Sequence, residues 1–208
     1  MSCVVYVLKG FGKMYTMKKI MLTAILGLIS VQFITAQEKV EFGIKGGLNF
    51  SSLKGDGIKD GDTRTSFHLG GLAHFHIDKM WAIQPELMYS AQGASYSNGQ
   101  TVKLNYFNLP VLGQYMFGDG FRLETGPQFG FNVNSKSDFD GVETDVNDNY
   151  KGFGLSWAFG IGYLTKGGLG FDARYNAGLT DISENNSNIK NSVWQFGLFY
   201  QFRPTTVK

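Results

Sequence analysis

Three basic and three acidic side chains share one face of a series of alternating segments between residues 40 and 202, and three histidines lie on the same face. Ionisable groups that leave water must be paired, because an unpaired buried charge costs several kcal/mol. Such a set could form a path for ions or protons, or a static polar network that fills an interior and fixes the register of its strands. We favour the static network. Its nine residues are Lys45, His68, His74, His76, Glu86, Arg122, Glu124, Asp172 and Arg174.

The histidines suggest two further kinds of chemistry. His74 and His76 are two residues apart, so they would lie on the same side of a strand and could share a metal ion, but the spacing supplies no third ligand. Ser66 and Ser90 are candidate nucleophiles for a histidine-assisted hydrolase, but no sequence motif surrounds either serine. We therefore predict no catalytic residue, no metal and no cofactor, and interpret the histidines as hydrogen-bonded interior groups.

These side chains are positioned by segments in which apolar residues recur at every second position. In residues 40–50, for example, Phe42, Ile44 and Leu48 fall on one side, and glycine and polar residues fall on the other. A period of two is typical of β-strands, because successive side chains point to opposite faces. The pattern predicts eight strands, at residues 40–50, 65–77, 80–91, 104–117, 121–132, 153–164, 168–179 and 191–202.

The composition of the two faces favours a barrel in a membrane. One face carries Phe, Leu, Ile and Trp, and the other carries glycine, polar residues and few charges. A soluble eight-stranded barrel of the lipocalin kind is the alternative, but its water-facing side would be rich in Lys, Glu and Thr. Many glycines fit a narrow lumen, since eight strands leave room only for side chains. We predict an all-β fold, an eight-stranded antiparallel up-and-down transmembrane β-barrel.

The connections between the predicted strands alternate in length, as they do in transmembrane barrels. Tight turns are expected at 78–79, 118–120 and 166–167, on the side where both ends of the barrel lie. Long polar loops are expected at 51–64, 92–103, 133–152 and 180–190. Aromatic residues near the strand ends predict interfacial girdles. They are Trp81, Tyr89, Phe117, Phe121, Phe153, Tyr163, Trp194 and Phe202.

The beginning of the chain has the features of a secretory signal peptide. A basic start at Lys18 and Lys19 precedes the apolar run 20–34, and a small-residue cleavage site follows Ala36. We predict a signal peptide at 1–36, in which 1–16 are an over-extended start before Met17, and a barrel domain at 37–208. Without residues 1–36, 15 basic and 17 acidic side chains remain, so nothing indicates a nucleic-acid partner. The single cysteine also falls in the leader, which leaves no disulfide framework.

Several of these strands resemble one family, the PorT-like outer-membrane β-barrel proteins of Bacteroidetes-type bacteria. The likeness extends from about residue 40 to residue 202, and it implies an outer-membrane barrel of the OmpA/OmpX type without implying a catalytic motif. The segments that carry it are Phe42–Phe50, Ile83–Ser90, Asn108–Leu112, Glu124–Gln128 and Gly170–Tyr175.

Together these features predict an exported, monomeric protein of the cell outer membrane that is not an enzyme. Its expected role is that of a structural or interaction scaffold, in which a barrel with a side-chain-filled lumen presents four extracellular loops. The expected partners are the lipids of the outer membrane, the barrel-assembly machinery during insertion, and an extracellular or envelope protein. The alternatives are a minor pore for small solutes and a lipid- or peptide-cleaving barrel hydrolase.

Overall fold

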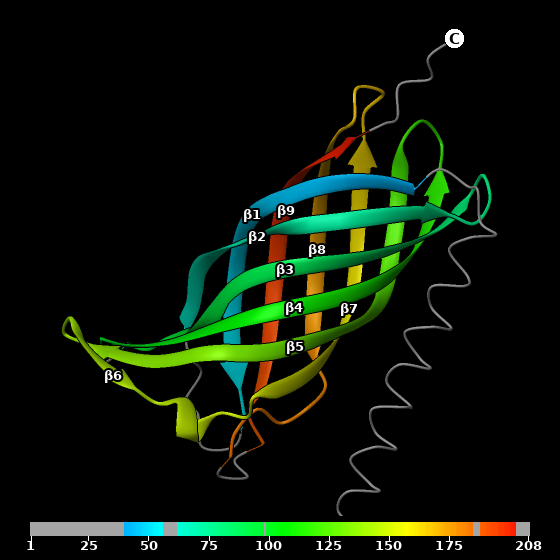
Figure 1. Cartoon of the computed structure of the whole chain (residues 1–208). Coiled ribbons are helices and arrows are strands. Elements are labelled where there is room, and N and C mark those ends of the chain that lie inside the picture. Colours follow the sequence, from blue (N-terminus) through cyan, green and yellow to red (C-terminus); the bar gives the residue numbers. More distant parts are fainter. Residues whose placement is uncertain (1–39, 56–61, 98, 185–187, 203–208) are drawn as a thin grey trace, which may run out of the picture. The chain divides into compact units, whose positions relative to one another are not determined.

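The computed structural model describes residues 40–55, 62–97, 99–184 and 188–202, which form antiparallel strands and one short 3-10 helix (Figure 1). The predicted leader 1–36 and its cleavage site lie outside the described residues. Within those residues no helix is long and apolar enough to cross a membrane. The elements are β1 (Val40–Lys54), β2 (Asp62–His76), β3 (Trp81–Ser95), β4 (Gln100–Phe117), β5 (Phe121–Phe139), β6 (Val142–Asp145), η1 (Asn147–Asn149), β7 (Phe153–Leu164), β8 (Leu169–Gly178) and β9 (Lys190–Phe202).

Eight of the strands close into a barrel, as the sequence predicts. Each strand pairs with the next along the chain, β5 pairs with β7, and β9 returns to pair with β1, so that Phe42 lies opposite Phe202. Closure leaves no unpaired edge in the ring, which is what a sheet needs in a solvent that offers no hydrogen bonds. The ninth strand, β6, pairs with β5 alone and stands outside the ring.

Tight turns join the strands at one end of the barrel, which we call the short-turn end. In the turn between β2 and β3, the Asp78 carboxylate accepts hydrogen bonds from the backbone N–H groups of Met80 and Trp81, both at 2.7 Å. Gly120, before β5, has a φ of 119°, and a Cβ there would lie 2.2 Å from the carbonyl oxygen of Leu164. Only glycine fits both the backbone conformation and the space.

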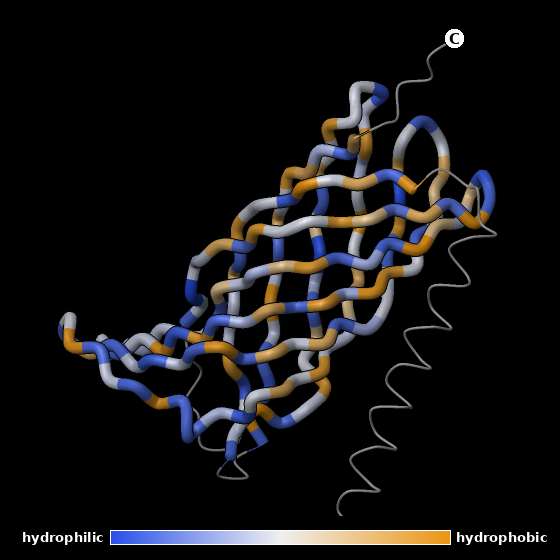
Figure 2. Tube along the Cα trace, viewed as in Figure 1, coloured by the Kyte–Doolittle hydropathy of each residue, from blue (hydrophilic) through white to orange (hydrophobic). Residues whose placement is uncertain are grey.

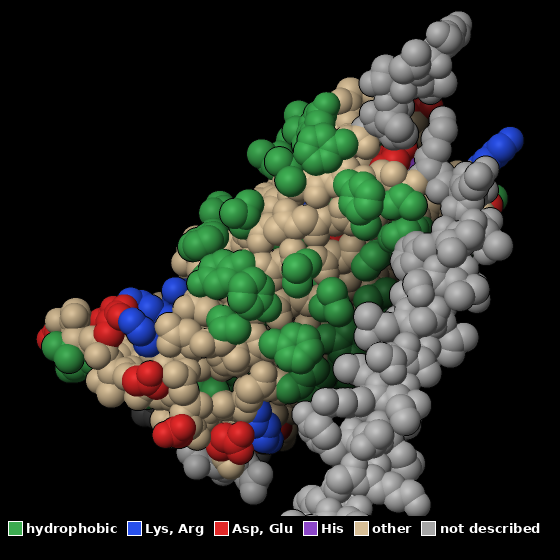
Figure 3. Space-filling model, viewed as in Figure 1, with side chains coloured by type: hydrophobic (Ala, Val, Ile, Leu, Met, Phe, Trp, Pro, Cys, Tyr) green, Lys and Arg blue, Asp and Glu red, His purple; other side chains and the backbone are tan. Residues whose placement is uncertain are grey.

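The alternating pattern divides the side chains as predicted. Phe42 is 62% exposed and Leu198 is 53% exposed, whereas inward-facing Arg174 is 1% exposed. Figure 2 shows the alternation along each strand, and Figure 3 shows apolar side chains distributed over the outer wall of the barrel. An apolar outside around a polar inside is the arrangement that a hydrocarbon solvent requires.

Aromatic residues form two bands, one near each end of the outer wall. At the short-turn end Trp81 lies against Tyr115, with ring centroids 4.9 Å apart, and Phe121 lies 4.8 Å from Tyr163. At the opposite end, which we call the long-loop end, Tyr175 lies 4.9 Å from Trp194. Aromatic residues concentrate at the two membrane–water interfaces, because amphipathic rings such as those of Trp and Tyr are stable at the level of the lipid headgroups.

The predicted long loops are wrong in part, because several strands continue through them. β1 continues to Lys54, β3 to Ser95 and β5 to Phe139, and β6 and η1 lie inside the segment predicted as the loop 133–152. As a result β4 and β5 are much longer than β7 and β8, and β5 projects with β6 past the end of the ring (Figure 1). Polar composition concealed these extensions, since strands outside a membrane need no apolar outer face.

An apolar cluster packs inside the long-loop end, and the sequence analysis missed it. The inward-facing positions that are polar within the barrel become apolar in the strand extensions, and Ile182 from the β8–β9 connection packs against them. We call this cluster the apolar cap. Its buried residues are Leu53, Ala94, Val102, Leu104, Tyr106 and Ile182, with Tyr96, Tyr150 and Ile189 packed against them.

Candidate functional site in the barrel lumen

The middle of the lumen holds an ion network centred on Arg174 of β8. Its guanidinium donates two hydrogen bonds to the Glu86 carboxylate, each 2.8 Å long, and a third, also 2.8 Å, from Nε to Glu124. Lys45 donates to Asp172 at 2.5 Å and lies 3.9 Å from Glu86. All five side chains are buried. The paired arrangement satisfies the requirement that charges removed from water be compensated.

Arg122 of β5 belongs to the same layer through neutral intermediates. Its guanidinium donates to the Gln114 amide oxygen at 3.4 Å and lies 5.3 Å from the ring centroid of Phe199. The Gln114 amide in turn donates to Glu124 at 3.0 Å. The structure therefore brings all six predicted charges into one layer, three of each sign.

Glycines in neighbouring strands make room for these long side chains. Gly160 of β7 lies in register between Glu124 and Arg174, and a Cβ on Gly160 would lie 2.6 Å from a carboxylate oxygen of Glu124. Gly197 of β9 is in register with Asp172, and a Cβ there would lie 2.4 Å from its carboxylate. The glycine-rich inner face is thus the counterpart of the charged residues, since large groups reach across positions that have no side chain.

The three predicted histidines do not converge on one point. Nδ1 of His68 lies 2.8 Å from the amide oxygen of Asn49, and Nδ1 of His74 lies 3.2 Å from the amide oxygen of Gln84. Amide oxygens only accept hydrogen bonds, so these contacts place a proton on Nδ1 of each ring. His76 is partly exposed near the short-turn end, where its ring meets that of His74 edge-on at 4.5 Å. In the described part of the chain, no cluster of three or more His, Cys, Asp or Glu side chains could hold a metal ion.

The two candidate nucleophiles bond to groups other than histidine. Ser66 donates to the carbonyl oxygen of Ala91 at 2.6 Å. Ser90 accepts from the amides of Asn49, at 3.0 Å, and Gln92, at 2.8 Å. A serine becomes nucleophilic when a base takes its proton, and none of these hydrogen bonds joins a serine to a base.

A layer of amide side chains separates the ion network from the apolar cap. Asn176 of β8 donates to Gln195 of β9 at 2.8 Å, and Gln195 donates to Asn49 of β1 at 3.0 Å, so that a chain of hydrogen bonds joins three neighbouring strands along the inner wall. The period of two places these residues on the inner face, but it assigns them no role. Their positions follow from the period of two, but their pairing depends on the register of β9 with β8 and with β1, which no local pattern encodes.

Two cavities flank the ion network. One, of about 340 Å³, opens at the short-turn end and is lined by His74, His76, Arg122 and Gln201 among others. The other, of about 30 Å³, lies in the amide layer below the apolar cap.

Beyond the ring, a small cluster of charges holds the β5–β6 hairpin. Asp138 and Glu143 lie directly opposite each other in register, and Lys103 bridges both, at 2.7 and 2.8 Å. Lys136 adds a contact of 2.7 Å to Glu143. Hydrogen bonds from Lys103 and Lys136 lower the pKa of the Glu143 carboxyl to about 2, so that it is ionised at all ordinary pH values. The two lysines relieve a like-charge pair that would otherwise weaken the hairpin.

Comparison with known proteins identifies the barrel. The family model of the outer membrane protein beta-barrel domain matches residues 35–184. The crystal structure of Ail, the attachment invasion locus protein of Yersinia pestis, is similar with a TM-score of 0.51 at 18% identity, over 79% of this chain and 99% of that one. The crystal structure of Neisserial surface protein A is similar with a TM-score of 0.58 at 12% identity, over 79% of this chain and all of that one (100%).

At such identities these likenesses show the fold alone, and no curated protein matches the chain. The family match is stronger, because it covers more than half of the 208 residues. This chain therefore belongs to the outer membrane protein beta-barrel domain family.

Proposed function

We propose that this protein is a non-conducting scaffold of the outer membrane, in which a plugged barrel holds its long-loop end outside the cell. The short-turn end would face the periplasm, as in other transmembrane barrels. Residues 1–36 would direct export and be removed after Ala36. Within the outer-membrane barrels, we propose that this protein belongs with the PorT-like proteins, because the five segments named in the sequence analysis resemble them.

The observation that carries this proposal is the ion network across the middle of the lumen. Arg174 and Glu86, from strands on different sides of the ring, meet through two hydrogen bonds of 2.8 Å at 1% and 2% exposure. An ion that passed this layer would have to displace buried, mutually paired charges. The eight-stranded ring gives those side chains little room to move aside. These contacts favour a static plug over the minor pore.

The partners and the lack of catalysis are part of the same proposal. The apolar outer wall fits outer-membrane lipids, and insertion would use the barrel-assembly machinery. The projecting β5–β6 hairpin, with its exposed Phe139 and Val142, offers a surface to an extracellular or envelope protein. The hydrogen bonds of Ser66 and Ser90 in the described lumen go to amide and carbonyl groups and not to a base, so we do not propose a hydrolase. We propose a monomer, because the closed ring of strands completes its own pairing.

Planar-bilayer recording tests the plugged lumen. We expect the purified protein to give no steady conductance in a bilayer in which a known porin, prepared in the same detergent, gives regular steps. The same preparation should show the protease resistance and heat-modifiable electrophoretic mobility of a folded barrel, which excludes unfolded protein as the reason for silence. Steady, reproducible channels from the folded protein would contradict the scaffold and establish the minor pore.

A further inference from the structure

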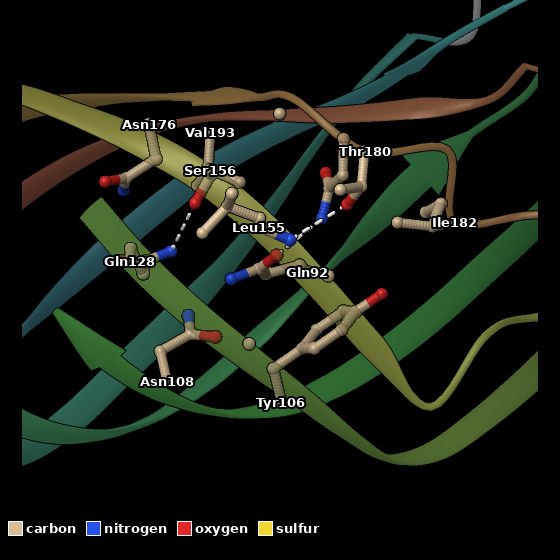
Figure 4. A pocket seen from close by; sticks show the side chains of 14 residues that line it. Gln92, Tyr106, Asn108, Gln128, Leu155, Ser156, Asn176, Thr180, Ile182 and Val193 are labelled. Carbon is tan, nitrogen blue, oxygen red and sulfur yellow. Dashed lines mark hydrogen bonds between the residues drawn. The ribbon is translucent and has the colours of Figure 1, made fainter.

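The cavity in the amide layer has the features of a binding site that the scaffold role does not require. It lies between the amide chain and the apolar cap, and its wall is contributed by β3, β4, β5, β7, β8, β9 and the β8–β9 connection (Figure 4). Its volume of about 30 Å³ exceeds the roughly 10–15 Å³ that one water molecule needs. The buried floor includes Asn108 and Asn176, whereas Ser156, Thr180 and Asn191 on the rim are partly exposed. The cavity is therefore partly open on the side of these residues, beside the apolar cap.

Several residues that line this cavity have a polar atom without a partner. The hydroxyl of Tyr106 and the amide nitrogen of Asn108 are buried and make no hydrogen bond, and the same holds for the amide oxygens of Asn176 and Asn191. Tyr106, Asn108 and Asn176 are each at least nine-tenths buried. Buried polar groups in native proteins are usually satisfied by protein groups or by bound molecules, water included, so a cluster of such groups indicates that molecules from solution complete them. The set offers both donors and acceptors.

The remaining lining residues determine the chemical class of that ligand. None of the fourteen described residues that line the cavity carries a charge, so neither an anion nor a cation would be compensated there. Leu155, Ile182 and Val193 contribute apolar surface beside the ring of Tyr106. A hydroxyl group can donate and accept at once, and a sugar ring combines hydroxyls with an apolar face.

We propose that the cavity binds the hydroxyl-bearing end of an uncharged saccharide. Asn108 and Tyr106 donate to sugar oxygens, Asn176 and Asn191 accept from sugar hydroxyls, and the ring lies against Leu155 and the Tyr106 ring. The enclosed volume admits one edge of a sugar, and the rest of the molecule lies at the rim. The proposal depends on the proposed function only for the side of the membrane from which the sugar arrives. Binding itself is measured without a membrane, so the two can fail separately.

Binding is tested by NMR titration of the full-length mature protein in dodecylphosphocholine micelles, a detergent without a sugar. The probes are methyl α-glucopyranoside and N-acetylglucosamine, with glucuronate as the charged comparison. We expect saturable shifts of the side-chain amide resonances of Asn108 and Asn176 with the neutral sugars, and at least about tenfold weaker binding of glucuronate, because its charge finds no partner. Failure of both neutral sugars to produce saturable shifts would overturn the proposal and leave the cavity a site for water only.

A matched pair of glycine variants locates the binding. A Cβ at Gly154 would lie 3.5 Å from Ile182 Cγ2 and 3.7 Å from Thr180 Oγ1, which is ordinary contact, so Gly154→Ala keeps the fold and narrows the cavity. A Cβ at Gly152, two residues earlier, meets no atom within 4 Å, so Gly152→Ala makes the same chemical change outside the cavity. We expect at least about tenfold weaker binding for Gly154→Ala, since there is no spare room for a sugar edge beside an added methyl group.

Gly152→Ala should bind as the unchanged protein does. Asn108→Leu, which removes one donor at similar size, should weaken binding about five- to tenfold, the effect expected for one neutral hydrogen bond. Equal affinity of Gly154→Ala and Gly152→Ala would place any bound sugar elsewhere and overturn the proposed site.

Discussion

Replacement of Glu86 by alanine is expected to destabilise the barrel by roughly 3–5 kcal/mol, the range found when one partner of a buried ion pair is removed. Glu86 accepts two hydrogen bonds from Arg174 and one of 2.9 Å from Gln84, and it lies 3.9 Å from Lys45. Its loss leaves three cations against two carboxylates in the middle of the lumen. The measurement is the free energy of unfolding in urea, with the protein refolded into lipid vesicles.

Two further variants separate charge compensation from a general effect of mutation. Glu143 also contacts two basic side chains, Lys103 and Lys136, but it lies in the exposed β5–β6 hairpin, so Glu143→Ala should leave the free energy of unfolding unchanged within error. The double variant Glu86→Gln with Arg174→Gln removes one charge of each sign, and it should be more stable than Glu86→Ala. A Glu86→Ala barrel as stable as the unchanged protein would show that water reaches this layer and that the lumen is not plugged.

Arginine in place of Leu198 is the second large effect that we expect, a loss of roughly 2–4 kcal/mol, the cost of a cation on the lipid face near the bilayer midplane. Leu198 is 53% exposed on the outer wall of β9. It lies four residues from Trp194 of the long-loop band and four from Phe202 of the short-turn end, so it is expected midway across the hydrocarbon. Urea unfolding in vesicles again measures the change.

The matched control is arginine at an equally exposed apolar residue outside the ring. Val142 is 68% exposed in β6, and Val142→Arg should have little effect because water already solvates that position. The difference between the two variants should persist in vesicles and shrink in detergent micelles, whose polar groups can approach an isolated charge. Equal effects of the two substitutions would mean that Leu198 is not surrounded by hydrocarbon.

Much of this fold can be predicted from the sequence because one physical rule, the period of two, decides it. The rule places Leu198 outside and Gln195 inside without any knowledge of their neighbours. A tight turn is also local where a side chain bonds within it, as Asp78 does to the N–H groups of Met80 and Trp81. For the same reason the sequence analysis could place the nine candidate site residues on a common face.

The features that could not be predicted from the sequence are mainly contacts between strands that are far apart in the chain. Arg174 and Glu86 are 88 residues apart, and their contact follows only from the closure of the ring and its register. Gly160 and Gly197 looked like general features of a narrow lumen, and their specific role follows from cross-strand neighbours. The strand extensions and the apolar cap were missed because polar loop composition does not distinguish a solvated strand from an irregular loop.

The most direct test of the central claim compares leucines of the two faces in one sample. With methyl-labelled leucine in otherwise deuterated protein and protonated lipid, nuclear Overhauser effects report which methyl groups touch acyl chains. Exposed Leu69, Leu87 and Leu198 should show strong cross-peaks to lipid methylene protons, and buried Leu72 and Leu112 should show none. Acyl-chain contacts at Leu72 and Leu112, or their absence at the other three, would contradict the claim that the apolar face meets lipid and the charged face is enclosed.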